Sequence, residues 1–63
     1  MEDNIQKILD KINFKLKYID ETNKYIIITK NNITKMLYYT SNKNLFNTLN
    51  YLVFDINIRG NKY

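Results

Sequence analysis

KYIIITKNNITKMLYYT, residues Lys24 to Thr40, is the stretch that decides the fold. Its two apolar runs are rich in isoleucine and tyrosine, which are enriched in β-strands, and the pair Asn31-Asn32 separates them. Asparagine tolerates the positive φ angles that a tight hairpin turn requires. The sequence therefore predicts a hairpin whose strands run from Tyr25 to Thr29 and from Ile33 to Tyr39.

Apolar periodicity predicts a helix before this hairpin, from Asp3 or Asn4 to Ile12. Its apolar residues recur at i, i+3, i+4 and i+7, which places them on one side of a helix. This stripe consists of Ile5, Ile8, Leu9 and Ile12.

The spacing changes after this helix. From Phe14 to Tyr18, apolar residues alternate with lysines, which is strand spacing. The polar segment 20–23 then supplies a turn into the hairpin. A first strand is therefore favoured here, with a helix that continues to Tyr18 as the alternative.

A second helix is predicted after the hairpin. Ser41 is the expected N-cap, since its hydroxyl can accept a hydrogen bond from the first turn. The helix is expected from Asn42 through Ile58, and Gly60 stands where a helix commonly ends. Its sheet-facing stripe consists of Leu45, Phe46, Leu49, Leu52, Val53 and Ile56. A second apolar stripe, directed away from the sheet, consists of Tyr51, Phe54 and Ile58. The alternative is a short C-terminal edge strand over 54–58, because apolar and polar residues alternate there.

Together these elements predict an α+β fold. We expect a single small αβββα domain over residues 1–63, with a three-stranded antiparallel sheet and the helices on one of its faces. A chain of 63 residues buries only about 60% of the surface that it exposes when unfolded. Because the sequence contains no Cys, a disulfide cannot compensate for so small a core. Self-association or a docked partner is therefore expected.

The number of residues in each turn decides which side chains share a face of the sheet. If both turns contain an even number of residues, the two faces are as follows. The face expected to hold the helices carries no charge: Phe14, Leu16, Tyr18, Tyr25, Ile27, Thr29, Thr34, Met36 and Tyr38. The face expected to remain open carries lysines around an apolar centre: Lys15, Lys17, Lys24, Lys30, Lys35, Ile19, Ile26, Ile28, Ile33, Leu37 and Tyr39.

Composition argues against catalysis. The chain has no Cys and no His, its one serine is the expected helix cap, and its one glycine cannot form a phosphate-binding loop. No enzyme activity, cofactor or metal site is predicted. Apolar runs are too short to span a membrane, and the acidic start is unlike a signal peptide. We therefore expect a cytoplasmic protein without a membrane partner.

The predicted function is non-catalytic binding to a larger protein or ribonucleoprotein, which the chain would obstruct and inhibit. An apolar centre within a polar rim is typical of an interface. The predicted partner face consists of Lys24, Ile26, Ile28, Lys30, Lys35, Leu37, Tyr39, Lys15 and Lys17. The net charge of +4 also favours anionic partners. One alternative is a small basic nucleic-acid-binding protein, with lysines on phosphates and tyrosines stacked on bases. Another is a homodimeric structural subunit.

The order of elements, with a short helix from Asn4 to Ile12, a three-stranded meander from Phe14 to Tyr39 and a helix from Asn42 onward, resembles that of some small phage-encoded anti-CRISPR inhibitors. The resemblance covers nearly the whole chain and involves element order and size. It implies an inhibitor of a defence ribonucleoprotein, encoded by a phage or mobile element. Those inhibitors are acidic and imitate nucleic acid, whereas this chain is basic. A basic inhibitor is expected to engage an acidic protein surface or the guide RNA.

Overall fold

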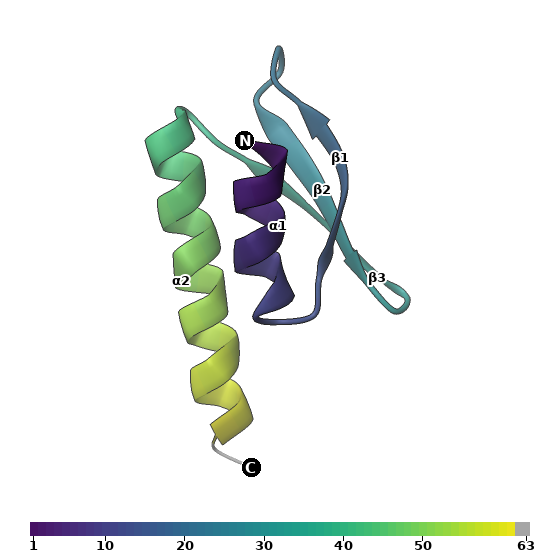
Figure 1. Cartoon of the computed structure of the whole chain (residues 1–63), viewed down its shortest axis with the longest axis vertical. Helices are drawn as coiled ribbons and strands as arrows, with labels where there is room; N and C mark the ends of the chain where they lie inside the picture. The colour runs from purple at the N-terminus through teal and green to yellow at the C-terminus, as the bar shows by residue number, and fades with distance from the viewer. Residues whose placement is uncertain (62–63) are drawn as a thin grey trace.

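The computed structural model describes residues 1–61, and the side chains through residue 59. Its elements are α1 (Glu2–Asp10), β1 (Lys15–Asp20), β2 (Tyr25–Lys30), β3 (Ile33–Tyr38) and α2 (Asn42–Asn61). The strands form one antiparallel sheet in the order β1-β2-β3, with both helices on one side of it (Figure 1). The predicted αβββα arrangement is therefore confirmed. The sequence also predicts a frayed tail over residues 61–63. This is wrong for Asn61, which belongs to α2, and residues 62 and 63 lie outside the described part of the chain.

The two ambiguous segments have clear outcomes. Lys15–Asp20 is a strand, so the alternative of a helix continuing to Tyr18 is wrong. Residues 54–58 belong to α2, so the alternative of an edge strand there is also wrong. Gly60 does not end α2, because the helix includes it and finishes at Asn61.

Local polar groups fix the ends of the helices. After α1, Asn13 adopts a φ of 61°, and the N–H of Phe14 donates to the carbonyl of Leu9 at 3.1 Å. This is the Schellman arrangement, with Asn in the left-handed position that glycine most often fills. Ser41 caps α2 as predicted: its hydroxyl accepts the N–H of Asn44 at 3.1 Å. The side-chain oxygen of Asn44 accepts a hydrogen bond from the N–H of Thr40 in return. Two reciprocal side-chain hydrogen bonds therefore fix the start of α2.

The Gln6 side chain joins α1 to the outer edge of β1. Its Nε2 donates to the carbonyl of Phe14 at 3.0 Å and to Oδ1 of Asp10 at 2.8 Å. Its Oε1 accepts the N–H of Leu16 at 2.9 Å. One amide side chain thus satisfies a donor and an acceptor on the strand backbone, as a neighbouring strand would.

Replacing Gln6 with Met is expected to destabilise the fold by about 1–3 kcal/mol, because the partly buried N–H of Leu16 and carbonyl of Phe14 lose their partners. Urea unfolding followed by circular dichroism measures this change. Lys7→Met is the matched control, since Lys7 is the next residue and is exposed. An effect of Gln6→Met no larger than that of the control would show that the amide contributes nothing.

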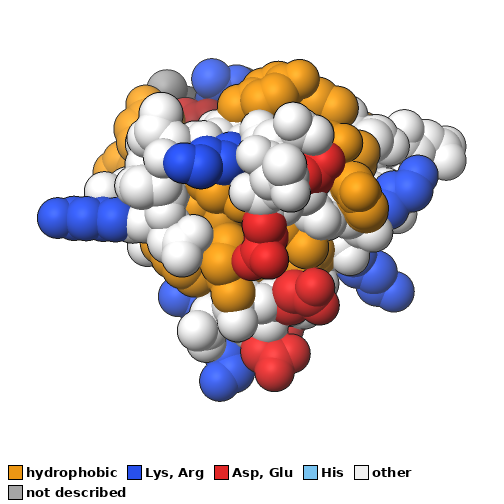
Figure 2. All heavy atoms as spheres, turned by 90° about the horizontal axis from the view of Figure 1, so that it is seen from above, with side chains coloured by type: hydrophobic (Ala, Val, Ile, Leu, Met, Phe, Trp, Pro, Cys, Tyr) orange, Lys and Arg blue, Asp and Glu red, His pale blue; other side chains and the backbone are white. Residues whose placement is uncertain are grey.

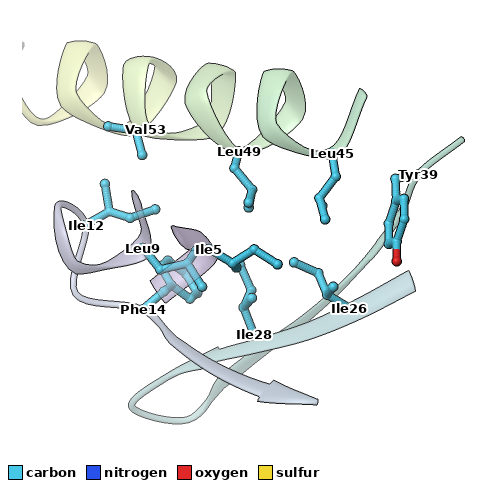
Figure 3. Packing of buried hydrophobic residues seen from close by; sticks show 10 residues of the cluster. All are labelled: Ile5, Leu9, Ile12, Phe14, Ile26, Ile28, Tyr39, Leu45, Leu49 and Val53. Atoms are coloured by element: carbon cyan, nitrogen blue, oxygen red, sulfur yellow. The ribbon is translucent and has the colours of Figure 1, made fainter. Parts of the chain in front are cut away.

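The core lies between the sheet and the two helices. Side chains from α1 and α2 converge on Ile26 and Ile28 of the central strand (Figure 3). The buried cluster comprises Ile5, Leu9, Ile12, Phe14, Ile26, Ile28, Tyr39, Leu45, Leu49 and Val53. Partly buried apolar residues surround it: Ile8, Leu16, Ile19, Leu37, Phe46, Leu52 and Ile56.

The hairpin register was predicted correctly. Lys30 pairs with Ile33 and Tyr25 with Tyr38, so the turn contains the two residues Asn31 and Asn32. Asn31 has the left-handed φ, at 54°. Asp20 pairs with Tyr25, so the first turn is also even.

The predicted covering of the sheet is wrong. The helices pack on the face of Ile26 and Ile28, which are fully buried, while the face of Tyr25 and Tyr38 is open. Isoleucine carries no polar atom, whereas burying tyrosine leaves a hydroxyl that needs a partner. The helices therefore cover the face with the aliphatic side chains, even though lysines border that face.

A β-bulge in β1 also changes the predicted faces. The ladder shifts between Leu16 and Tyr18, leaving Lys17 as the extra residue. Leu16 then pairs with Ile28 on the covered face, and Lys15 pairs with Thr29 on the open face. The sequence prediction had grouped Leu16 with Tyr25 and Ile27, and Lys15 with Ile26 and Ile28. The bulge exchanges these neighbours, so Leu16 is covered and Lys15 is open, as predicted, although the faces to which they belong are reversed.

A candidate protein-interaction surface

The open side of the sheet carries a group of apolar and aromatic side chains that we call the tyrosine face. Its members come from all three strands: Tyr18, Tyr25, Ile27, Met36 and Tyr38. Ladder pairing places Tyr18 opposite Ile27 and Tyr25 opposite Tyr38. The central strand thus fixes the relative positions of side chains that are far apart in the sequence.

The three tyrosine rings form a row across the sheet. The ring centroids of Tyr18 and Tyr25 lie 6.1 Å apart, and those of Tyr25 and Tyr38 lie 5.8 Å apart. Both pairs are tilted, at 53° and 49°, which is a favourable geometry for aromatic contacts. Tyr38 remains 70% exposed, Tyr18 50% and Met36 49%. The row is therefore ordered by its own contacts and still accessible.

Asp20 and Tyr25 set the charge of this face. The backbone N–H and side-chain amide of Asn23 donate to the Asp20 carboxylate at 2.9 and 3.0 Å, and they lower its pKa below the ordinary value. Desolvation, followed by the negative charge of Asp20, raises the pKa of Tyr25 above its ordinary value. At neutral pH the Tyr25 phenol is therefore uncharged and lies beside the Asp20 carboxylate.

The predicted partner face is not a single surface. Its residues Ile26, Ile28 and Tyr39 are buried in the core, and Leu37 packs against the core. The prediction that they form an exposed apolar centre is wrong, because they are the residues on which the helices pack.

The lysines of that predicted face are dispersed. The ammonium group of Lys30 lies 5.7 Å from the centroid of the Phe14 ring, and that of Lys24 donates to the carbonyl of Thr40 at 3.3 Å. Lys15, Lys17 and Lys35 are exposed. Figure 2 shows cationic side chains projecting in several directions, and several acidic side chains between the middle of that view and its lower edge. A binding role for these lysines stays a prediction.

The second apolar stripe predicted on α2 is present and exposed. Tyr51 is 70% exposed, Phe54 60% and Ile58 41%. Residues on the other side of the same helix, including Leu49 and Val53, are buried. The stripe therefore faces solvent on the side of α2 away from the core.

The described residues contain little that suggests chemistry. A hollow of about 260 Å³, lined by Glu2, Leu16, Lys17, Tyr18 and Ile19, lies at the β1 end of the sheet and is open to solvent. Within residues 1–61, no three acidic side chains come close enough together to hold a metal ion. In that same part of the chain, neither helix has the length and apolarity needed to cross a membrane.

Sequence reasoning placed the members of the tyrosine face together, but it added Phe14 and Leu16, which pack in and against the core, and it assigned the group the wrong role. Its members were placed together by strand alternation and an even turn, but they were expected beneath the helices. The useful signal was the composition of the two faces, because three tyrosines in a row favour a surface that keeps their hydroxyls in water.

No protein-family model, curated protein or solved structure matches this chain.

Proposed function

We propose that this protein acts without catalysis, by docking the tyrosine face on a larger protein and obstructing it. The observation that carries the proposal is an ordered row of three tyrosines, of which Tyr18 and Tyr38 are exposed, beside Ile27 and Met36 on an uncovered sheet. Tyrosine and methionine are enriched in interface cores, where charged residues are depleted. Truncating a tyrosine at such a site commonly has a large effect on affinity.

The edges of this face support the same proposal. By ladder pairing, Thr29, Thr34, Lys15 and Asp20 lie around the tyrosine face on the same side of the sheet. A polar border around an apolar centre excludes water from the central contacts when a partner binds. The resemblance in element order to small anti-CRISPR inhibitors extends the proposal to a defence ribonucleoprotein as the obstructed partner.

Nucleic-acid binding is the second candidate, because aromatic side chains on adjacent strands can stack on bases. The distribution of positive charge favours it less. Some of the lysines predicted to contact an anionic partner lie on different sides of the sheet. By register, Lys15 lies on the same side as the tyrosine face, whereas Lys30 and Lys35 pair with residues on the helix-covered side. Phosphate contacts beside the tyrosine row are therefore few.

Affinity capture with matched variants tests the proposal. The immobilised protein is exposed to host-cell lysate with and without nuclease, and each recovered protein or ribonucleoprotein is then purified and titrated. Tyr38→Ser is expected to weaken the binding of the purified partner about thirtyfold, in line with a 2 kcal/mol hot spot. Tyr51→Ser is the control, since Tyr51 has the same exposed fraction but lies on α2.

Retention of full affinity by Tyr38→Ser would contradict docking through the tyrosine face. A parallel titration with a fluorescent single-stranded oligonucleotide separates the second candidate. Binding that weakens steeply with salt would support nucleic-acid binding instead, because phosphate contacts release counterions.

A further inference from the structure

The two edges of the sheet differ in how they are protected against pairing with another strand. At the β1 edge, the bulge at Lys17 interrupts the ladder, and Gln6 occupies backbone groups of Phe14 and Leu16. Bulges and covering side chains are common ways to block an edge strand. The β3 edge is built differently, because its register with β2 is continuous from Ile33 to Tyr38.

The register shows which backbone groups β3 directs outward. The N–H of Tyr39 donates to the carbonyl of Lys24 at 3.0 Å, continuing the β2–β3 ladder beyond the strand. Since alternate residues of an antiparallel strand point toward and away from the neighbouring strand, the odd-numbered residues of β3 bond to β2. Thr34, Met36 and Tyr38 therefore turn their backbone N–H and C=O groups to the open edge.

The side chains of β3 favour pairing as well. The strand ITKMLY carries one charge, Lys35, and contains no proline. Ile33 on the helix side and Met36 and Tyr38 on the tyrosine face are all exposed. A regular edge strand with apolar residues and one charge is a template for another strand.

We propose that β3 pairs antiparallel with β3 of a second copy of this chain, about a twofold axis at Met36, to form a continuous six-stranded sheet. In this register Met36 lies opposite Met36 of the second copy, and Thr34 lies opposite its Tyr38. Lys35 lies opposite Leu37 of the second copy. Every contact occurs twice, as a twofold interface requires.

Charge and overlap select this register from its neighbours. Shifting the strands one way places Lys35 opposite Lys35 of the second copy, and like charges directly opposite are destabilising. Shifting them the other way puts Leu37 opposite Leu37 and leaves only residues 36–38 of each β3 facing one another. The register centred on Met36 keeps residues 34–38 paired and separates the two lysines.

A second copy is also the occupant that fits the size of the chain. With 63 residues, each copy has a small core, and pairing covers apolar side chains that one copy leaves exposed. The twofold axis stands perpendicular to the sheet, so both tyrosine faces lie on one side and become a single longer surface. The dimer does not depend on whether that surface then binds a partner.

Charge exchange at the axis tests this register. Sedimentation equilibrium should give the wild type a mass of twice 7.7 kDa at high protein concentration. Met36→Lys and Met36→Glu should each raise the dimer dissociation constant at least tenfold, since each places like charges opposite one another. An equal mixture of the two variants should recover the dimer mass, because Lys and Glu then meet at the axis. Met36 is half-exposed, so circular dichroism of each variant should match the wild type.

Tyr18→Lys is the matched control, because it adds a lysine to the tyrosine face on the strand farthest from β3. It should leave the dimer unchanged. Loss of the dimer in this control, or failure of the mixture to recover it, would overturn pairing at Met36.

Amide hydrogen exchange of the wild type gives a measurement that needs no variant. The N–H groups of Thr34, Met36 and Tyr38 should exchange at least tenfold faster after dilution below the dissociation constant, and those of Ile26 and Ile28 should not. A wild type that remains 7.7 kDa at millimolar concentration, or outward amides whose exchange is independent of dilution, would overturn the proposal. A dimer that is lost only in variants of the exposed α2 stripe would also overturn the proposal, because the dimer contact would then lie between helices.

Discussion

Replacing Ile26 with Ala is expected to destabilise the protein by about 2–5 kcal/mol. Ile26 is fully buried on the central strand, where side chains of both helices converge. Truncation removes apolar contacts and leaves a cavity that a packed core fills only in part. Domains of this size often have a total stability of about 3–5 kcal/mol, so the variant should be largely unfolded at 25 °C. Circular dichroism and urea unfolding measure the effect.

The neighbouring isoleucine provides the control for that experiment. Ile27 has the same side chain on the same strand, but it points to the tyrosine face and is only partly buried. Ile27→Ala should therefore cost clearly less than Ile26→Ala. Ile26→Val, expected to cost about 0.5–1.5 kcal/mol, gives a folded variant for a quantitative measurement. Equal losses at positions 26 and 27 would contradict the assignment of the covered face.

Local patterns predicted the order and type of every element, because each depends on neighbouring residues. The spacing of apolar residues indicated α1 and α2, and a turn of two asparagines fixed the β2–β3 register. Ser41 was identified as a cap because its hydroxyl acts within one helical turn. Features of this kind are set over a few residues, so a single sequence can reveal them.

The bulge and the Gln6 contacts depend on the assembled fold. The segment from Phe14 to Tyr18 alternates regularly in sequence, and an extra residue at Lys17 appears only when β1 pairs with β2. Gln6 lies between the apolar residues of α1 and has no sequence feature that distinguishes it. Its partners are backbone groups of β1, which the α1–β1 turn brings beside it.

The choice of covered face required a comparison of two energies. The absence of charge favoured burial of the tyrosine side, and the aliphatic character of Ile26 and Ile28 favoured the other. Lysines at strand ends cost little beside a core, because their stems pack while their ammonium groups remain in water. Tyrosine hydroxyls on the central part of a sheet cannot reach water when helices cover them, and burying them without a hydrogen-bond partner is costly. The tyrosine face therefore stays open, and this open face is the candidate site.

Replacing Leu49 with Ala is expected to release α2 from the rest of the fold. Leu49 is fully buried at the middle of the α2 face that contacts the core, between Leu45 and Val53 (Figure 3). The expected cost is again about 2–5 kcal/mol. The helix itself cannot compensate, because most helical stability in proteins comes from tertiary packing of the apolar face. Amide exchange along α2 should therefore accelerate at least as strongly as exchange in β2.

Phe54 on the same helix is the matched control for Leu49. It is the larger side chain, but it lies in the exposed stripe with Tyr51. Phe54→Ala should change the free energy of unfolding by less than about 1 kcal/mol, because most of the ring is already in water. Side-chain size alone predicts a larger loss of stability at Phe54, whereas burial predicts a larger loss at Leu49. A larger loss at Phe54 than at Leu49 would show that the exposed stripe is covered in solution, and it would make α2 a contact surface in its own right.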